Sequence, residues 1–387
     1  MKTQVAIIGG GPTGLLLSRY LAKHGVESIV IEDRSRDYVM TRIRAGMLET
    51  GTVELLDELG LADRLYKEGM EHEGIYLQWP GERHHINFKQ LVGKTCWVYG
   101  QTEIQHDLHV ACDAAGQEIH YEVSNVELHD MESTSPYVTF TDKDGNAQRI
   151  DCDVIAGCDG FWGVSRKSIP DVEKGTFERV YPYGWLGILA RVKPSADELI
   201  YAWHPDGFAL LSMRSPEVSR LYIQVDPNDD INNWPDDRIW DELDKRLALD
   251  GWTLERGEVF EKSIVAMRSF VSSTMQHGRL FLAGDSAHIV PPTGAKGLNL
   301  AVSDVRILGE SLVALLDDGN EEMAATYTNR ALTKIWRATH FSYWMTSMLH
   351  TTGDRFDYAM QLSQLRHVTM SRNAAANLAE NYCGLPI

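Results

Sequence analysis

The sequence predicts a mixed α/β (α+β) fold with a Rossmann-like βαβ unit, a mainly β domain and a helical C-terminal region. Three observations support this prediction. A short buried-type strand, residues 5–8, leads directly into a glycine-rich turn and a helical pattern. The stretch 181–225 is rich in aromatic and other β-forming residues and alternates in polarity near its end. After Gly294 the pattern is helical almost to the end of the chain.

Composition and charge restrict the classes of function. A length of 387 residues favours two or three cooperating domains. The net charge of −18 argues against nucleic acid as a partner, because phosphate binding needs a basic face. Five cysteines without a CxxC pair indicate a reducing, cytoplasmic compartment and argue against a bound metal. No run is long enough to span a membrane, and the N-terminus lacks the cleavage site of a signal peptide.

The first 32 residues read as the start of a βαβ unit. Gly9, Gly11 and Gly14 form a G-x-G-x-x-G motif between the first strand and the first helix. Such glycines permit a tight turn, close approach of a pyrophosphate and tight helix–strand packing, with the anion at the helix N-terminus. Glu32 ends the second strand at the spacing of a ribose-binding acid. Together these residues predict a dinucleotide site and leave both FAD and NAD(P) open.

Two later Gly-Asp features bear on that choice. Asp159 follows an expected strand at 153–156, and Asp285 follows another at 280–283. Each alone is more often an ordinary turn. Open α/β sheets bind ligands at the carboxyl ends of their strands, so three such ends favour a long, extended cofactor. A conventional NAD dehydrogenase would leave both aspartates unexplained.

The other expected elements are short. In chain order they are helices over 52–60 and 61–69, a strand at 75–78, a helix near 103–115, a strand at 137–140 and an alternating strand at 221–225.

The β-rich region contains a candidate site for an acid. Ser212 and Arg214 lie on one expected strand, and Arg220 and Tyr222 lie on the next. Residues two apart on a strand point to the same face. An arginine with hydroxyl donors beside it suits bidentate binding of a carboxylate. The alternative is that these are surface arginines paired with acidic side chains.

Longer runs resemble the FAD-dependent aromatic hydroxylases, in particular those acting on 4-hydroxybenzoate. They are YV at 38–39, RIRAG at 42–46, YGQTE at 99–103, FERVYP at 177–182, GWLG at 184–187, MQHGRLFLAGD at 275–285, HIVPPTGAKGLNL at 288–300 and AENY at 379–382. The resemblance covers essentially the whole chain. It implies that NADH or NADPH reduces FAD, that O2 then forms a flavin hydroperoxide, and that 4-hydroxybenzoate is hydroxylated at the 3-position to 3,4-dihydroxybenzoate (protocatechuate).

The resemblance also implies roles at the substrate. Ser212, Arg214 and Tyr222 would bind the carboxylate, and the Pro292 carbonyl and Thr293 would face the phenol side. Tyr201 would contact the phenol, with Tyr382 behind it and His72 as the proton exchange point near solvent. Removing the phenol proton activates the ortho carbon, and hydrogen-bonded tyrosines can carry it outward. A lone tyrosine or histidine is more often a core or surface residue, so only the joint match supports these roles.

For FAD, the resemblance implies a set of contacts along the chain. They come from Gly9, Gly11, Gly14, Glu32, Arg42, Arg44, Gln101, Asp159, Arg220, Asp285, Lys296, Leu298 and Asn299. Arg220 would help to hold an inner position of the flavin ring. The helix that begins near 296–299 would direct its N-terminal amides at the flavin, and Lys296 would add positive potential.

The residues that match nicotinamide contacts depart from the pattern of NADPH-preferring relatives. The matches are Tyr38, Arg42, Arg44, Arg166 and Arg268. NADPH-preferring members commonly have Arg-Gln after the ribose-binding acid and a histidine at position 162, where this chain has Asp33, Arg34 and Trp162. Aspartate repels a 2′-phosphate and Arg34 partly offsets it, so we predict good use of NADH.

We expect three segments: 1–175 as the first part of the FAD-binding domain, 176–278 as the β-sheet substrate domain, and 279–387 as a return to the FAD domain plus a helical interface region. The resemblance implies a homodimer. Two alternatives stay open: a hydroxylase for another aromatic acid, such as 3-hydroxybenzoate or 4-aminobenzoate, and a flavin-binding protein that does not hydroxylate.

Overall fold

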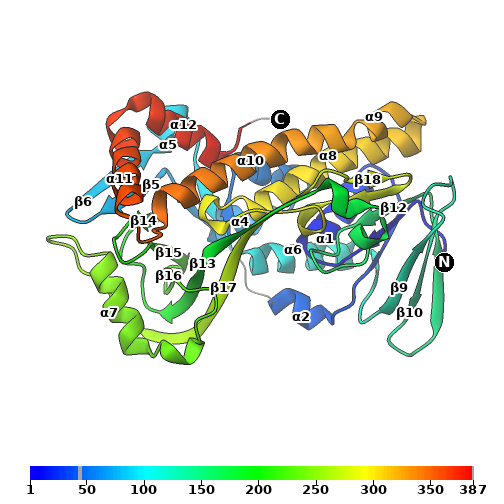
Figure 1. The fold of residues 1–387 in the computed structure, drawn as a ribbon. Helices are drawn as coiled ribbons and strands as arrows, with labels where there is room; N and C mark the ends of the chain where they lie inside the picture. Colours follow the sequence, from blue (N-terminus) through cyan, green and yellow to red (C-terminus); the bar gives the residue numbers. More distant parts are fainter. Residues whose placement is uncertain (42–45, 386–387) are drawn as a thin grey trace.

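The structure is a computed structural model that describes residues 1–41 and 46–385. Arg42 and Arg44, both expected at the cofactor, lie outside the described residues. Two large sheets lie at opposite ends of the molecule, and two long strands and a layer of helices connect them (Figure 1).

The first large sheet has six strands in the order β18-β19-β12-β1-β2-β8. Its strands are β1 (Val5–Ile8), β2 (Ser28–Ile31), β8 (Glu118–His120), β12 (Val154–Gly157), β18 (Gln276–His277) and β19 (Leu280–Leu282). All pairs are parallel except β18 with β19. The central strands β1, β2 and β12 are wholly buried, as expected for a parallel sheet that is covered on both faces. The expected βαβ start is therefore confirmed.

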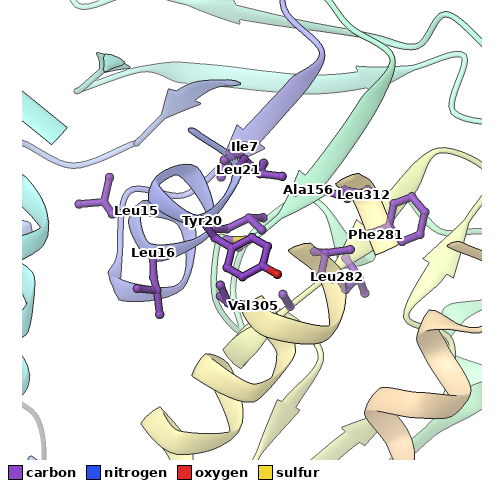
Figure 2. Close-up of a cluster of buried hydrophobic side chains, with 14 of the residues drawn as sticks. Ile7, Leu15, Leu16, Tyr20, Leu21, Ala156, Phe281, Leu282, Val305 and Leu312 are labelled. Atoms are coloured by element: carbon purple, nitrogen blue, oxygen red, sulfur yellow. The ribbon is translucent and has the colours of Figure 1, made fainter. Parts of the chain in front are cut away.

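Helices α1 (Pro12–Lys23), α6 (Gln101–Ala114) and α8 (Gly297–Asp318) pack around this sheet. Leu15, Leu16 and Leu21 of α1 belong to the same buried cluster as Ile7 of β1 and Val305 of α8. Figure 2 shows these side chains together, with others from β12 and β19. The cluster joins residues from both ends of the chain, so the core around the βαβ unit is completed only when the strand at 280–282 returns.

The second large sheet has eight strands in the order β20-β17-β13-β16-β15-β14-β5-β6. They are β5 (Gly74–Trp79), β6 (Glu82–Asn87), β13 (Thr176–Arg191), β14 (Ile200–Ala202), β15 (Ala209–Ser215), β16 (Val218–Val225), β17 (Glu258–Ser272) and β20 (His288–Ile289). Strands β13 and β17 pair along most of their length and run between the two ends of the molecule (Figure 1).

The hairpin of β5 and β6 departs from the expected division of the chain. It lies within the segment 1–175, which we assigned to the FAD-binding part, yet β5 pairs in parallel with β14 of the second sheet. Local pattern identifies β5 as a strand but does not say which sheet it joins, because that depends on long-range pairing. The division into three segments otherwise stays a prediction.

Two small sheets and further helices complete the fold. The sheets contain β3 (Met47–Leu48), β7 (Cys96–Val98) and β4 (Met70–His72), and β11 (Ala147–Asp151), β10 (Tyr137–Thr141) and β9 (Ser124–His129). The helices are α2 (Arg36–Thr41), α3 (Thr50–Glu58), α4 (Asp63–Glu68), α5 (Phe88–Val92), α7 (Asp236–Arg246), α9 (Glu321–Ala325), α10 (Tyr327–Leu349), α11 (Arg355–Met370) and α12 (Arg372–Cys383). Helices α8 and α10 run side by side (Figure 1). Among the described helices, none is long and apolar enough to cross a membrane.

A pair of glycine substitutions tests the packing of the first turn. A Cβ on Gly14 would overlap the carbonyl oxygen of Gly9, so we expect Gly14→Ala to lower the free energy of unfolding by about 1–3 kcal/mol. Gly51, in α3, is exposed, and a Cβ there would meet no atom within 4 Å, so Gly51→Ala should be neutral or stabilise by up to about 1 kcal/mol. Urea denaturation followed by circular dichroism compares the two. Equal effects would show that the turn tolerates a side chain.

Candidate active site

Three strand ends meet at one edge of the parallel sheet. Strands β1, β12 and β19 are neighbours and run in the same direction, so Gly9, Asp159 and Asp285 follow strands that end at the same edge. Gly9 has φ +108°, and a Cβ there would overlap the carbonyl oxygen of Cys158. Two of the three strand ends are therefore in backbone contact. An extended ligand along this edge can reach all three.

The glycine-rich turn leaves space at the start of α1. Gly11 is the N-cap residue and supplies no side-chain hydrogen bond to the first turn. A Cβ on Gly11 would meet no atom within 4 Å. The first amides of α1 therefore have no side-chain cap and face open space at Gly11, which is the arrangement that binds a phosphate at a helix N-terminus.

Glu32 lies beside this turn. Its Oε2 accepts a hydrogen bond from the Gly10 amide at 2.6 Å, and its Oε1 accepts one from the Arg34 amide at 3.0 Å. Burial, together with the neighbouring Asp33, raises the pKa of Glu32 to about 7. The carboxyl group is thus fixed at the end of β2, at the place expected for a contact with a ribose hydroxyl.

The two later aspartates differ in their surroundings. Asp159 accepts a hydrogen bond on Oδ2 from the Ser165 amide at 2.8 Å, whereas its Oδ1 is buried and has no hydrogen-bond partner among the described residues. Burial raises the pKa of Asp159. Asp285 is exposed, in the 3-10 turn η4 (Gly284–Ser286). A buried acceptor without a partner is costly, and a ligand hydroxyl or amide would satisfy it.

Helix α8 begins with a second uncapped N-terminus. It follows the 3-10 turn η5 (Pro292–Gly294) and Ala295, whose φ is +54°. Its N-cap residue, Lys296, supplies no side-chain cap, and a Cβ on Gly297 would meet no atom within 4 Å. The start of a 22-residue helix is therefore open, and its amides carry a partial positive charge.

The side chains of Lys296 and Asn299 are already engaged within the protein. Lys296 is buried, forms an ion pair with Glu49 at 2.5 Å and donates to the Tyr382 carbonyl at 3.0 Å. Asn299 makes four hydrogen bonds to protein groups. The ion pair with Glu49 offsets the positive potential that we expected Lys296 to add, so this role stays a prediction. A role for either residue at FAD would pass through the backbone of α8.

These features together fit FAD. Two uncapped helix N-termini supply amide donors for its pyrophosphate and for its ring. Glu32 and Asp159 supply acceptors for hydroxyl groups. Gln101 and Leu298 lie in the first turns of α6 and α8, where the sequence places them near the cofactor, and this stays a prediction.

A cavity lies between the second sheet and the loop before α8. The expected substrate residues Tyr201, Ser212, Arg214, Tyr222 and Pro292 all line it, as does Arg220; the other lining residues are Gly46, Met47, Val98, Trp185, Leu199, Leu210, Met213 and Ala295. Ser212 stands opposite Arg220 across strands β15 and β16, and Leu210 stands opposite Tyr222. The pairing on neighbouring strands that we expected is confirmed.

Arg214 is held inside this cavity. It donates to the hydroxyl of Thr102, and a Cβ on Gly100 would overlap its guanidinium group. Burial, followed by the nearby Arg220, lowers the pKa of Arg214, although a guanidinium remains charged in proteins. Two guanidinium groups in one cavity favour an anionic ligand. The alternative of two surface arginines is wrong for Arg214, which is largely buried.

Two tyrosines join the cavity to the C-terminal helix α12. The Tyr201 and Tyr382 hydroxyls are 2.7 Å apart, and each side chain is 1% exposed. Burial raises the pKa of both hydroxyls, so both are neutral. Thr293, beside Pro292, is buried and accepts a hydrogen bond from the Thr346 hydroxyl at 2.9 Å. A neutral hydroxyl pair can accept a proton at one end and release one at the other.

His72 differs from what we expected. It was placed near solvent as the exchange point for protons, but its side chain is 1% exposed. Its Nδ1 is buried without a hydrogen-bond partner among the described residues, and burial lowers its pKa. His72 is the last residue of β4 and pairs with Cys96 of β7, a pairing that sequence spacing alone does not reveal. His72 therefore does not exchange protons directly with bulk water in this conformation.

The residues expected to contact the nicotinamide nucleotide differ in exposure and in their contacts. Trp162 is 77% exposed, and the Arg268 guanidinium lies 6.0 Å from its ring centre. Arg34 is 3.5 Å from Asp33 and 5.6 Å from the ring centre of Tyr38. These residues remain accessible to a ligand.

Arg166 is different, because its buried side chain donates to the carbonyl groups of Phe161 and Ser286. It is a structural contact between the end of β12 and the turn after β19. Within the described part of the chain, no three His, Cys, Asp or Glu side chains cluster in a way that could hold a metal ion.

The sequence reasoning missed part of the cavity. Trp185, Leu199, Leu210, Met213 and Met47 line it without having been named. Leu210 had a usable signal, since it shares the two-residue spacing of Ser212 and Arg214 on one strand. Thr102 and Gly100 had none, because they reach Arg214 from a distant part of the chain.

Comparison with known proteins identifies the family of this chain. The model of the FAD binding domain family matches residues 2–342. The chain is 48% identical to a p-hydroxybenzoate hydroxylase of Acinetobacter baylyi, over all of this chain and 96% of that protein. Its fold is similar to that of p-nitrophenol 4-monooxygenase PnpA from Pseudomonas putida, with a TM-score of 0.84, 19% identity and full coverage of both chains. It is also similar to OxyS anhydrotetracycline hydroxylase from Streptomyces rimosus, with a TM-score of 0.77, 20% identity, and coverage of 100% of this chain and 77% of that one.

The family match spans most of the chain, and the first relative matches along its whole length. Both agree with a donor and acceptor set that fits FAD at the edge of the parallel sheet. The chain therefore belongs to the FAD binding domain family, and within it to the flavin-dependent monooxygenases.

Proposed function

We propose that the chain hydroxylates 4-hydroxybenzoate at the 3-position, using NAD(P)H, a proton and O2, to give 3,4-dihydroxybenzoate, NAD(P)+ and water. One observation carries the proposal. A single cavity contains a carboxylate-binding set, Ser212, Arg214 and Tyr222, and a hydroxyl pair that begins at Tyr201. These two sets match the two polar ends of a para-substituted phenolic acid. The related p-hydroxybenzoate hydroxylase supports the same substrate.

Arg214 would bind the substrate carboxylate. The guanidinium is planar and can donate two parallel hydrogen bonds, and Ser212 and Tyr222 supply hydroxyl donors beside it. The contact with Thr102 and the close approach of Gly100 leave Arg214 little freedom to turn away. The substrate would thus enter a site in which the charged group is already oriented, so little ordering is needed on binding.

Tyr201 would accept the phenol proton of the substrate and pass its own proton to Tyr382, 2.7 Å away. The resulting phenolate directs electron density to the adjacent ring carbon, which is the carbon to be hydroxylated. Pro292 lines the same cavity, and its carbonyl would accept a hydrogen bond from the phenol side. His72 is buried, so a proton that reached it would still have to be passed on to solvent by another group.

The glycine-rich turn, Glu32, Asp159, Asp285 and the start of α8 would hold FAD. Bound FAD supplies the redox chemistry: it takes up a hydride from the nicotinamide and activates O2 for transfer of one oxygen atom. The protein's own contribution is to hold the substrate, remove its proton and keep bulk water out of a cavity walled largely by buried side chains.

Product analysis tests this function. The FAD-loaded protein is incubated aerobically with NADH or NADPH and 4-hydroxybenzoate, 3-hydroxybenzoate or 4-aminobenzoate in turn. The proposal requires 3,4-dihydroxybenzoate from 4-hydroxybenzoate as the main product. Faster turnover of another acid would establish the related hydroxylase instead. Hydrogen peroxide without any hydroxylated product would establish a flavin-binding protein that does not hydroxylate.

We further propose a cytoplasmic homodimer. The five cysteines are all free and buried, which agrees with a reducing compartment. The dimer rests on the resemblance to the family, and light scattering on a sizing column tests it.

Removal of the Tyr201 hydroxyl should slow hydroxylation. In Tyr201→Phe the phenol has no acceptor on the way to Tyr382, so we expect the rate of hydroxylation to fall by a factor of roughly 10²–10⁴ at neutral pH. The dissociation constant of 4-hydroxybenzoate should rise much less, because Arg214 is intact. The lost rate should partly return at high pH, where the free substrate is already ionised. Rapid-reaction kinetics across pH measure this, and a flat pH profile would contradict the relay.

Gly11→Ala should separate cofactor binding from stability. The added Cβ meets no protein atom within 4 Å, so the FAD-free protein should melt as the parent does. We expect FAD to bind at least about tenfold more weakly, because the methyl group occupies the approach of the pyrophosphate. Fluorescence titration with FAD and a thermal melt of the FAD-free protein test both parts. Unchanged FAD affinity would place the pyrophosphate elsewhere.

NADH should be used at least as efficiently as NADPH. Asp33 is exposed next to Glu32 and repels a 2′-phosphate, and Arg34 offsets this only in part because it lies 3.5 Å from Asp33. Asp33→Asn should therefore raise kcat/KM for NADPH more than for NADH. Steady-state kinetics with both nucleotides test this. A strong preference of the parent protein for NADPH would refute it.

A further inference from the structure

His350 is a buried histidine that the proposed reaction does not use. It follows α10 and is 1% exposed. Its Nε2 is 2.6 Å from the indole Nε1 of Trp185, and its Nδ1 is 3.0 Å from the Thr346 carbonyl oxygen. An indole N–H can only donate and a carbonyl can only accept. The ring must therefore carry its proton on Nδ1 and accept on Nε2, so it is a neutral imidazole in a fixed tautomer.

Aromatic rings surround this imidazole. It is stacked on Tyr183 with ring centres 4.8 Å apart, lies 4.6 Å from the centre of Phe208 and is nearly parallel to Trp185 at 13°. Burial lowers the pKa of His350 to about 3, so the ring stays neutral throughout the range in which the protein would work. The hydrogen bond to Trp185 is therefore not switched by ordinary changes of pH.

Trp185 connects His350 to the cavity. Its indole lines the cavity and lies 4.6 Å, centre to centre, from the ring of Tyr222. An indole has a single N–H donor, and in Trp185 this donor is taken by His350. His350 does not line the cavity itself. Any effect that it has on a ligand must pass through the position of the indole.

Hydrogen bonds to neighbouring elements fix the end of α10, where His350 contacts Trp185. Gln224 of β16 donates to the Thr351 carbonyl at 2.7 Å and accepts from the Thr351 amide at 3.1 Å. Gln361 of α11 donates to the His350 carbonyl at 2.7 Å. One turn earlier in α10, Thr346 donates to Thr293 in the loop beside the cavity. The backbone of His350 is thus bonded to the neighbouring helix, and that of the next residue, Thr351, is bonded to the sheet.

We propose that His350 is a positioning residue that fixes the Trp185 indole and thereby sets the width of the substrate cavity. This rests on the proposed function for the identity of the ligand, an aromatic acid. With the indole fixed, a one-ring acid fits between Trp185 and the Pro292 loop, whereas a fused two-ring acid is excluded. Without the bond, the indole can turn and the cavity can widen.

The test uses the FAD-loaded protein and its variants His350→Leu, His350→Gln, Trp185→Phe and the double variant Trp185→Phe with His350→Leu. The discrimination ratio is the dissociation constant of 6-hydroxy-2-naphthoate divided by that of 4-hydroxybenzoate, from the change in flavin absorbance. His350→Leu should lower this ratio by about fivefold or more, the size of a coupling between residues in contact. His350→Gln keeps an acceptor and should retain part of the ratio. In the Trp185→Phe background, His350→Leu should change it less than about twofold.

A second measurement follows the hydrogen bond between Trp185 and His350 directly. The indole N–H signal of Trp185, identified by its loss in Trp185→Phe, should shift and exchange faster with solvent in His350→Leu. Gln224→Leu serves as the matched control, because it removes the side-chain bonds to Thr351 at the same end of α10, together with one to the Phe208 amide, and leaves the hydrogen bonds of the imidazole intact. It should leave the ratio within about twofold of the parent.

Three results would overturn the proposal. One is an equal effect of His350→Leu with and without the Trp185 indole, since the histidine would then act on the fold in general. Another is an unchanged ratio while the indole signal has moved. The third is a loss of discrimination in Gln224→Leu as large as that in His350→Leu. A parent protein that binds both acids but hydroxylates neither would refute the proposed function, and the binding ratios would still decide the role of His350.

Discussion

The amide of Asn299 joins parts of the chain that are about 250 residues apart, and both ligand sites depend on it. Its Oδ1 accepts from the Glu49 amide at 2.9 Å and from the Thr52 hydroxyl at 2.7 Å. Its Nδ2 donates to the carbonyl groups of Met47 and Ala295. All four hydrogen-bonding positions of the side chain are thus filled by protein groups, in a buried place where an unfilled one would cost about 1–3 kcal/mol. The bonds hold the start of α8, the loop before it and the segment 47–52 in one arrangement. That arrangement forms one wall of the cavity, since Met47 and Ala295 both line it.

The loop 284–297 therefore serves two sites at once. Its first turn is fixed from α8, because Asp304 accepts from the Gly284 amide at 2.9 Å and lies 2.6 Å from His288. Burial alone would lower the pKa of His288, but Asp304 raises it above the usual value, so the pair is favoured as a charged one. Pro291 and Pro292 then restrict the backbone, and Ala295 completes the turn in a left-handed conformation at φ +54°. Asp285 on one side and Pro292 on the other are held by the same short piece of chain. A displacement of this loop would alter cofactor and substrate contacts together.

The sequence predicted the parts of the site that follow from local pattern. These parts are the βαβ start, the three strand ends and the same-face pairs on β15 and β16. All of them depend on the spacing of residues close together in sequence, which long-range contacts do not alter. Of the substrate residues that came from the resemblance, Tyr201, Ser212, Arg214, Tyr222 and Pro292 meet in one cavity, whereas Thr293 is buried beside it and does not line it. What failed depends on contacts between distant segments. Lys296 is paired with Glu49, 247 residues away, and His72 is buried in a small sheet whose strand pairing the sequence does not show. The hairpin of β5 and β6 joined the second sheet for the same reason. His350 was passed over because a buried histidine at a helix end has no local signature.

The electrostatics of the cavity contrast with those of the whole chain. The net charge is −18, which on average repels an anionic substrate, yet no carboxylate is among the described residues that line the cavity. Arg214 and Arg220 are both there, and the remaining polar side chains are the hydroxyl-bearing Tyr201, Ser212 and Tyr222. In a largely buried site the two guanidinium groups act over a short distance with little screening, so they outweigh the distant surface charge. The same field favours a second negative charge on the substrate phenol once its proton has left. The neutral hydroxyls of Tyr201 and Tyr382 suit this site, because a fixed negative charge there would compete with the substrate for the arginines.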